Sequence, residues 1–184
     1  MQKRHTDRES YFGEQSQTSK NYYIPYIKEV IGHIPDKVLE VGCGEGGNLL
    51  PFAKAGCRVM GVDIDAMRIE QARTFFTQRH QQGQFIATDI FQLEDKAMNF
   101  PLILLHDVIE HIRDKERFLS GLQKHLSADG AVFVGFPAWQ MPFGGHQQIA
   151  HSHIVSHFPF LHLLPRTLYR CCLLYTSPSP RDRG

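Results

Sequence analysis

The sequence lacks the charge imbalance that marks several classes of binding protein. Its 20 Lys and Arg residues are matched by 19 Asp and Glu residues, which gives a formal net charge of +1. A protein that binds nucleic acid or an anionic membrane through charge needs a basic patch, and this balance gives no sign of one. We therefore expect the partner to be a small molecule or another protein, and not a nucleic acid.

Long hydrophobic runs are also missing. A membrane-spanning helix needs about 18 or more consecutive apolar residues, and no stretch of the chain is that long without interruption. The beginning of the chain, MQKRHTDRESYFGEQSQTSK, has no apolar core of the kind found in signal peptides. We expect no membrane span and a cytoplasmic location.

Cysteine is scarce, with four residues in the chain. Cys43 and Cys57 fall within predicted core segments, while Cys171 and Cys172 are adjacent near the end. This layout is not typical of a disulfide framework or of a zinc site. Reduced thiols are consistent with the cytoplasm.

Short apolar runs alternate with helical patterns along the chain, whose 184 residues are enough for one domain. The predicted strands are 37–42, 57–63, 83–89, 100–107 and 130–136, and the predicted helices are 19–33, 47–55, 65–80 and 114–127. This alternation predicts an α/β fold with a Rossmann-like, doubly wound, mostly parallel sheet. We expect a flexible arm over 1–17 and the folded domain over 18–170.

Ligands of such sheets bind beyond the carboxyl ends of the strands. After the first strand, the stretch LEVGCGEGGNL places Gly42, Gly44 and Gly47 at the spacing G-x-G-x-x-G. This spacing also occurs in nicotinamide enzymes and does not choose a cofactor. Asp63 ends the second strand, where a carboxylate can accept hydrogen bonds from both ribose hydroxyls of an adenosine. The alternative role for Asp63 is to cap the helix at 65–80.

Three further carboxylates favour one class of cofactor. Glu40 precedes the glycines, Glu45 lies inside the turn, and Asp89 follows the third strand. Carboxylates would repel a pyrophosphate but attract a sulfonium or an ammonium group. The pattern therefore favours a cationic cofactor over a dinucleotide.

Five stretches together resemble a known family. VLEVGCGEGGNL, MGVDID, ATDI, LLHDVIEHI and ADGAVFVGFP, spread over residues 37–137, are similar in order and spacing to the motifs of class I S-adenosylmethionine-dependent methyltransferases. The segment DVIEHI most resembles the small-molecule members that methylate quinone-precursor phenols. The resemblance implies S-adenosyl-L-methionine as cofactor and a small-molecule acceptor that is methylated on oxygen or nitrogen. The cofactor-binding residues that it implies are Glu40, Gly42, Cys43, Gly44, Asp63, Ile64, Asp89, Ile90 and His106.

The resemblance also implies a role for most of these residues. Glu40 and the glycines, with Gly46 or Gly47 as the last, would surround the methionine portion. Asp63 would hold the ribose, Asp89 the adenine amino group, and Ile90 would lie against the ring. His106 would lie beneath the methyl group.

Methyl transfer from a sulfonium is an in-line displacement that needs alignment and, for a hydroxyl acceptor, removal of a proton. We expect His106 or His111, near the end of the fourth strand, to act as the catalytic base. The alternative is that Glu110 and His111 begin the following helix, with Asp107 as its N-cap; for Asp107 we favour this alternative.

A metal-assisted reaction is a second possible mechanism. The spacing Asp107-x-x-Glu110-His111, with His146 downstream, resembles the metal site of methyltransferases that act on the hydroxyls of small-RNA 3′ ends. That family has Glu at the position of Asp107 and a second His after Glu110, so we expect no metal. The remaining hypotheses are a methyltransferase-like binding subunit without catalysis and a nicotinamide oxidoreductase.

The last part of the chain departs from the family pattern. We expect Trp139, Phe143 and His146 to face the acceptor; the alternative is a loop and helix that cover the sheet edge. The final stretch, CCLLYTSPSPRDRG, resembles translated read-through of a sequencing adapter. We therefore expect residues 171–184 to be non-native and the sheet to lack the family's last two strands, whereas the alternative is a genuine disordered tail.

Overall fold

The structure is a computed structural model that describes residues 7–93, 99–138, 141–142, 157–165 and 167. The chain divides into two compact units, one formed by Asp7–Phe136 and the other by Met1–Thr6 with Pro137–Gly184. In the second unit, the described residues include a short 3-10 helix, η7 (Leu161–Leu163), preceded by a hydrogen bond from the Phe160 N–H to the Pro142 carbonyl. The predicted site lies in the first unit, apart from Trp139, Phe143 and His146, which are outside the described residues.

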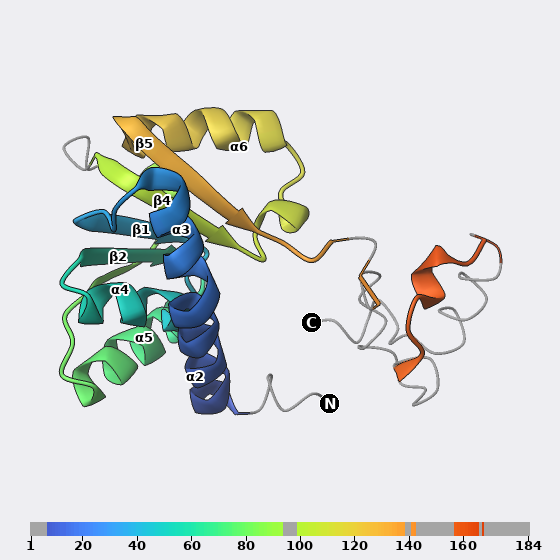
Figure 1. Cartoon of the computed structure of the whole chain (residues 1–184), viewed down its shortest axis with the longest axis horizontal. Helices are drawn as coiled ribbons and strands as arrows, with labels where there is room; N and C mark the ends of the chain where they lie inside the picture. The colour runs from blue at the N-terminus through green and yellow to red at the C-terminus, as the bar shows by residue number, and fades with distance from the viewer. Residues whose placement is uncertain (1–6, 94–98, 139–140, 143–156, 166, 168–184) are drawn as a thin grey trace. The chain divides into compact units, whose positions relative to one another are not determined.

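The first unit is built on a five-stranded parallel sheet with the order β3-β2-β1-β4-β5 (Figure 1). The strands are β1 (Lys37–Val41), β2 (Arg58–Asp63), β3 (Gln84–Ala87), β4 (Phe100–His106) and β5 (Leu126–Gly135). The strand order reverses between β1 and β4, and ligands of such sheets bind at this switch point. The prediction of a Rossmann-like, doubly wound parallel sheet is confirmed.

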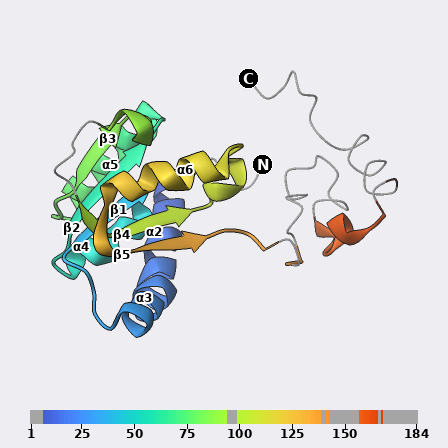
Figure 2. The ribbon, with the colours of Figure 1, turned by 90° about the horizontal axis from the view of Figure 1, so that it is seen from above.

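Helices cover both faces of this sheet (Figure 2). Alternate residues of β1 point to opposite faces, so Val38 packs in one hydrophobic cluster and Leu39 in another. The first cluster includes α2 (Arg8–Thr18), α3 (Ile24–Ile31), α4 (Leu50–Lys54) and α5 (Ala66–Gln78), and the second includes α6 (Lys115–Leu122). The short helices are the π-helix η1 (Ser19–Tyr23) and the 3-10 helices η2 (Gly47–Leu49), η3 (Ile90–Gln92), η4 (Ile109–His111) and η5 (Gln123–His125). Below, the two sides are called the α2–α5 face and the α6 face.

Residues 8–17 form most of helix α2, so the expected flexible arm is wrong for this segment. The side chain of Asp7 caps the helix by accepting a hydrogen bond from the Ser10 N–H at 2.9 Å. Phe12 is fully buried, with its ring 5.0 Å from the ring of Phe75. The polar sequence of α2 gives a weak helical pattern because its stability comes from tertiary contacts rather than from a broad apolar stripe.

Truncation of Phe12 tests whether α2 belongs to the folded core. We expect Phe12→Ala to lower the free energy of unfolding by about 3–5 kcal/mol, the usual cost of removing a buried aromatic ring. Tyr22→Ala is the matched control because Tyr22 is 68% exposed, and its effect should stay within about 0.5 kcal/mol. Chemical denaturation measures both, and equal small effects would show that α2 is not docked in solution.

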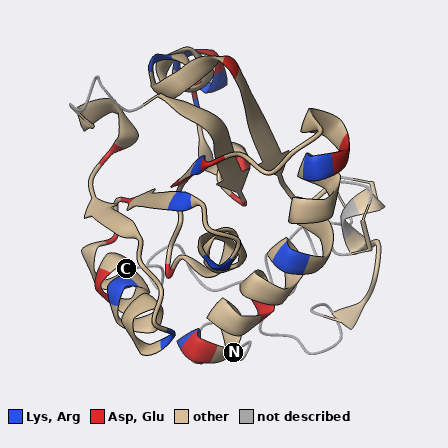
Figure 3. Cartoon of the chain, turned by 60° about the vertical axis from the view of Figure 1, so that its left-hand side comes forward, with Lys and Arg blue, Asp and Glu red and all other residues tan. Residues whose placement is uncertain are grey.

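Charged residues of both signs are spread over the described elements (Figure 3). None of the described helices combines the length and the apolar character that crossing a bilayer requires.

Candidate functional site

The turn after β1 depends on glycine at three positions. Gly42, Gly44 and Gly46 have φ angles of 71°, 52° and 80°, in the left-handed region that side chains with a Cβ rarely adopt. A Cβ on Gly42 would also collide with the side chain of Val108. Gly46 is therefore the third glycine of the turn. Gly47 is constrained for another reason, since a Cβ there would lie 2.7 Å from the carbonyl oxygen of Phe12, where α2 crosses the turn.

Asp63, at the end of β2, is anchored to this turn. Its Oδ2 accepts a hydrogen bond from the Gly44 N–H at 2.8 Å, and its Oδ1 accepts one from the Asp65 N–H at 2.9 Å. The alternative role of Asp63 as the cap of the following helix is wrong, because Asp65 caps α5 by accepting from the N–H groups of Met67 and Arg68. Asp63 thus fixes the glycine turn from the neighbouring strand.

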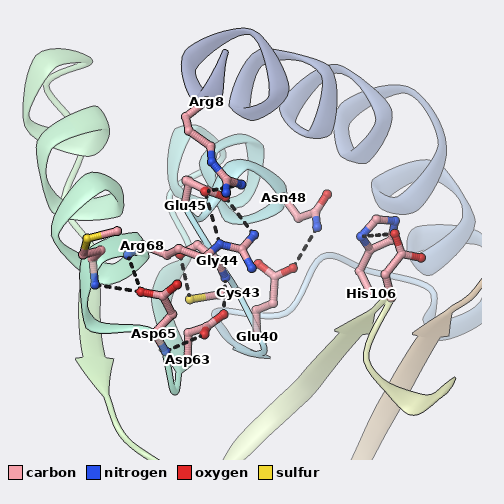
Figure 4. A network of polar contacts seen from close by, with 12 residues as sticks. Arg8, Glu40, Cys43, Gly44, Glu45, Asn48, Asp63, Asp65, Arg68 and His106 are labelled. Carbon is pink, nitrogen blue, oxygen red and sulfur yellow. Dashed lines mark hydrogen bonds and ion pairs between the residues drawn. The ribbon is translucent and has the colours of Figure 1, made fainter. Parts of the chain in front are cut away.

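Glu45 does not serve the ligand as the sequence suggested. Its side chain is fully buried, with Oε1 3.1 Å from Nη1 of Arg8 and Oε2 2.9 Å from Nη2 of Arg68 (Figure 4). Two guanidinium groups therefore neutralise this carboxylate and tie α2 and α5 to the turn. The interpretation of Glu45 as an attraction for a cationic cofactor is corrected to a structural one.

The Glu45 ion pairs give a stability prediction. Glu45→Gln should lower the free energy of unfolding by about 3 kcal/mol, because the change leaves the partly buried Arg68 without its counter-charge. Glu70→Gln is the control, since it breaks the exposed pair of Glu70 with Arg73, and exposed pairs contribute about 1 kcal/mol or less. Urea denaturation of both variants measures the difference, and a loss no larger for Glu45→Gln than for Glu70→Gln would contradict this role.

A cavity of about 550 Å³ opens at the carboxyl edge of the sheet. The predicted cofactor residues Gly42, Asp63, Ile64, Asp89 and Ile90 all line it. Ile64 is 82% exposed, as expected for an apolar side chain that would be covered by a ligand. Further lining residues include Val41, Val62 and Phe118 of the α6-face cluster, together with Asp107, Val108 and His111. The volume is in the usual range of small-molecule sites, about 300–1,000 Å³.

Glu40 and His106 lie on the α2–α5 face instead. The strand alternation of β1 and β4 places them on the side of Val38 and Leu104, away from Leu39 and Leu105. Glu40 is 1% exposed, and the Asn48 side-chain N–H donates to its Oε1 at 2.8 Å (Figure 4). Its Oε2 is buried and accepts no hydrogen bond from the described residues. Burial, with a smaller contribution from Asp63, raises the pKa of Glu40 to about 8.

The unpartnered oxygen of Glu40 decides whether a cationic cofactor fits here. A buried carboxylate oxygen without a donor is rare in folded proteins and calls for a ligand, a water or an ion. The glycines that follow Glu40 have positive φ angles and no side chains, a feature of turns whose backbone approaches a ligand closely. These residues fit a nucleoside ligand that carries an ammonium group. Cys43 can offer only its backbone, because its Sγ is buried beneath the turn, against Gly61.

Sequence reasoning missed the contact of Tyr23 with the candidate site residue His106. Its ring centroid lies 5.7 Å from that of His106 and 4.8 Å from that of Phe133. Burial, with smaller contributions from the carboxylates of Asp107 and Glu40, raises the pKa of Tyr23 to about 12. Tyr23 lies in the π-helix η1, and such segments are frequent at functional sites. The sequence pattern predicts a helical aromatic here, with no sign that it reaches β4.

The structure separates the two histidines that the sequence grouped as candidate bases. His106 packs against Tyr23, whereas His111 lines the cavity on the α6 face. Asp107, between them, has a φ of 54°, and its side-chain Oδ2 lies 3.8 Å from Nδ1 of His106. Asp107 is not the N-cap of α6, because Asp114 holds that position and accepts from the Arg117 N–H. The favoured capping role of Asp107 is therefore wrong.

The metal alternative depended on Asp107, Glu110, His111 and His146. His146 lies outside the described residues, and within the described ranges no three His, Cys, Asp or Glu side chains gather where they could hold a metal ion. Both carboxylate oxygens of Glu110 are buried and accept no hydrogen bond from described residues.

Comparisons with known proteins agree with this architecture. Residues 39–132 match the family model described as methyltransferase domain. The chain belongs to this methyltransferase domain family. It is 33% identical over 118 residues to a ubiquinone biosynthesis O-methyltransferase from Bartonella quintana, an alignment that covers 61% of this chain and 48% of that protein. A ubiquinone biosynthesis O-methyltransferase from Brucella ovis is 32% identical over 98 residues, an alignment that covers 53% of this chain and 40% of that protein. The chain thus spans about half the length, or less, of these curated relatives.

Solved structures of other methyltransferases share the fold of this methyltransferase domain. PKMT2 from Rickettsia typhi, solved in complex with AdoHcy, superposes with a TM-score of 0.55 at 28% identity. The match covers 63% of this chain and 25% of the PKMT2 chain. Coclaurine N-methyltransferase, solved with N-methylheliamine and SAH, gives a TM-score of 0.54 at 25% identity. This match covers 61% of this chain and 34% of the coclaurine N-methyltransferase chain. The predicted resemblance to methyltransferases is confirmed.

Proposed function

We propose that this methyltransferase domain transfers a methyl group from S-adenosyl-L-methionine to a small-molecule acceptor. The observation that carries the proposal is the arrangement around the glycine turn. Asp63, Ile64 and Asp89 line a cavity on one side of it, and the free oxygen of Glu40 is buried on the other. A ligand with a nucleoside at one end and an ammonium group at the other would fill the cavity with the first and pair with the Glu40 oxygen through the second. The AdoHcy and SAH complexes of the similar structures support this assignment.

Each predicted residue then has a place. Asp63 and Ile64 hold the ribose, Asp89 and Ile90 the adenine, and the backbone of Gly42, Cys43 and Gly44 with the Glu40 carboxylate holds the amino-acid end. The cofactor supplies a methyl group on a cationic sulfur whose leaving group is neutral. The remaining work of the protein is to align the acceptor and to remove its proton.

We assign the role of base to His106 and place His111 in the wall of the adenosine cavity. His106 lies on the same face as Glu40 and near Tyr23. The Oδ2 of Asp107 lies 3.8 Å from Nδ1 of His106, on the chain immediately after it. The relatives named as ubiquinone biosynthesis O-methyltransferases support oxygen as the methylated atom. The resemblance of DVIEHI to the members that methylate quinone-precursor phenols favours a phenolic hydroxyl. We also propose a cytoplasmic setting, in which the buried free thiols of Cys43 and Cys57 stay reduced.

A screen of phenols with S-adenosylmethionine labelled in its methyl group tests this function. The expected result is transfer of label to a phenolic oxygen, together with production of S-adenosylhomocysteine. Binding of S-adenosylhomocysteine without transfer to any phenol, amine or other small-molecule acceptor would instead indicate a binding subunit. Transfer to an RNA 3′ end that stops on chelation would indicate the metal-assisted alternative.

A further inference from the structure

A chain of buried hydrogen bonds leads from the N-terminal helices to Glu40. Ser19, in the π-helix η1, is fully buried, and its Oγ donates to the backbone carbonyl of Asn48 at 2.8 Å. The side-chain N–H of Asn48, which is 1% exposed, donates to Oε1 of Glu40 at 2.8 Å. The position of Asn48 is therefore fixed by one bond, and it fixes Glu40 through another.

This arrangement leaves Glu40 with one oxygen held and one oxygen free. A carboxylate has two oxygens that can each accept hydrogen bonds, and the described residues satisfy only Oε1. Because Asn48 holds Oε1, the carboxylate cannot rotate without losing that bond, and Oε2 stays available for a ligand. A preformed acceptor of this kind raises affinity by avoiding the cost of ordering the group on binding.

We infer that Asn48 is a positioning residue for the amino-acid end of the cofactor, and that Ser19 supports it from the N-terminal π-helix. The inference rests on the proposed function and adds to it two residues that do not line the described cavity. It also gives the N-terminal helices a part in cofactor binding through η1, in addition to their packing role. Asn48 acts on the ligand only through Glu40.

Two ligands that differ in one portion separate this role from a general effect on folding. S-adenosylhomocysteine carries the amino-acid portion, whereas 5′-methylthioadenosine has the same adenosine and sulfur but lacks the ammonium and carboxylate. Asn48→Leu removes the N–H donor and keeps a side chain of similar size without adding a charge. For this variant we expect a dissociation constant for S-adenosylhomocysteine that is about tenfold higher. The constant for 5′-methylthioadenosine should change by less than about twofold.

The dependence of binding on pH gives a second readout. Burial and, to a smaller extent, the nearby Asp63 raise the pKa of Glu40, while the Asn48 hydrogen bond and Arg68 lower it, and together these effects give a pKa of about 8. An ammonium ligand favours the ionised carboxylate, so affinity for S-adenosylhomocysteine should rise with pH until it levels off near pH 8. Removal of the Asn48 donor raises the pKa of Glu40, so the levelling-off point should move to higher pH. Affinity for 5′-methylthioadenosine should not follow this change.

The full chain is used for all titrations, with Gln15→Leu as the matched control. Gln15 is also a buried amide next to the turn, but it does not hydrogen-bond to Glu40, whose Oε1 is held by Asn48. Its loss should therefore affect the two ligands equally. If the Asn48 variant does not fold, Ser19→Ala should raise the dissociation constant for S-adenosylhomocysteine by about threefold and leave that for 5′-methylthioadenosine unchanged. An equal loss for both ligands, or none, would overturn the assignment. A wild-type chain that binds neither ligand would overturn the proposed function as well.

Discussion

Asp63→Ala is expected to weaken the binding of S-adenosylhomocysteine by about 100-fold or more. Hydrogen bonds to a charged acceptor contribute about 1.5–3 kcal/mol each, and the proposed ribose contacts would use two of them. The variant also removes the acceptor for the Gly44 N–H, which holds the glycine turn to β2 at 2.8 Å. Both effects reduce the affinity, so this substitution should have the largest effect on binding.

The control for Asp63 is an aspartate with a capping role elsewhere in the fold. Asp114→Ala removes the N-cap of α6, where the Asp114 side chain accepts from the Arg117 N–H at 3.0 Å. It should cost about 1 kcal/mol of stability and leave the dissociation constant within about twofold. Calorimetric titration below the melting temperature of each variant measures the affinities. An affinity of Asp63→Ala within about threefold of wild type would remove Asp63 from the nucleoside site.

His106→Gln is expected to slow methyl transfer to a phenolic acceptor by about 100-fold, the lower end of what a general base contributes. His106 is placed on the same face as Glu40, with its ring 5.7 Å from that of Tyr23. The substitution keeps a polar side chain of similar length but cannot take up the proton. The dissociation constant for S-adenosylhomocysteine should change by less than about fivefold.

His111→Gln provides the opposite pattern. His111 lines the cavity with Asp89 and Ile90, so its loss should raise the dissociation constant by about fivefold and leave kcat at saturating cofactor within about threefold. Single-turnover measurements with labelled methyl groups separate the two effects. A large loss of kcat in His111→Gln with none in His106→Gln would reverse the assignment of the base.

The strands could be predicted because each is an apolar run buried between two layers of helices. The expected strand at 37–42 is Lys37–Val41, and the one at 57–63 is Arg58–Asp63. The least accurate strand prediction was the last one, which was expected at 130–136 and is found at Leu126–Gly135. Its first residues, LSAD, lack an apolar run, and their pairing with β4 is irregular between Phe100 and Leu102. Such pairing depends on the neighbouring strand and leaves no local pattern.

Helix α2 and the true anchors of the turn could not be predicted for a related reason. Only Phe12 and Gln15 of α2 are buried, and its ion pair from Arg8 to Glu45 joins residues far apart in the sequence. The charges of Glu45 and Arg68 can be read from the sequence, but their pairing cannot. Asp63 and Asp65 are both plausible caps by spacing, and only the backbone geometry assigns the cap to Asp65.

The separation of His106 from His111 coincides with a backbone conformation that the sequence does not reveal. Asp107 adopts a φ of 54°, which is uncommon for a residue with a side chain. This turn directs the chain from the α2–α5 face, where His106 lies, to the cavity wall that contains His111. Asn48 and Tyr23 were missed because their contacts with Glu40 and His106 come from packing between elements.

The glycine turn serves a methyl donor and not a dinucleotide in the function proposed for this domain. Calorimetric titration of the full chain with S-adenosylhomocysteine, and separately with NAD, is the decisive test of that choice. We expect saturable binding of S-adenosylhomocysteine at one site per chain and no binding of NAD at the same concentrations. Binding of NAD without binding of S-adenosylhomocysteine would contradict the proposed function.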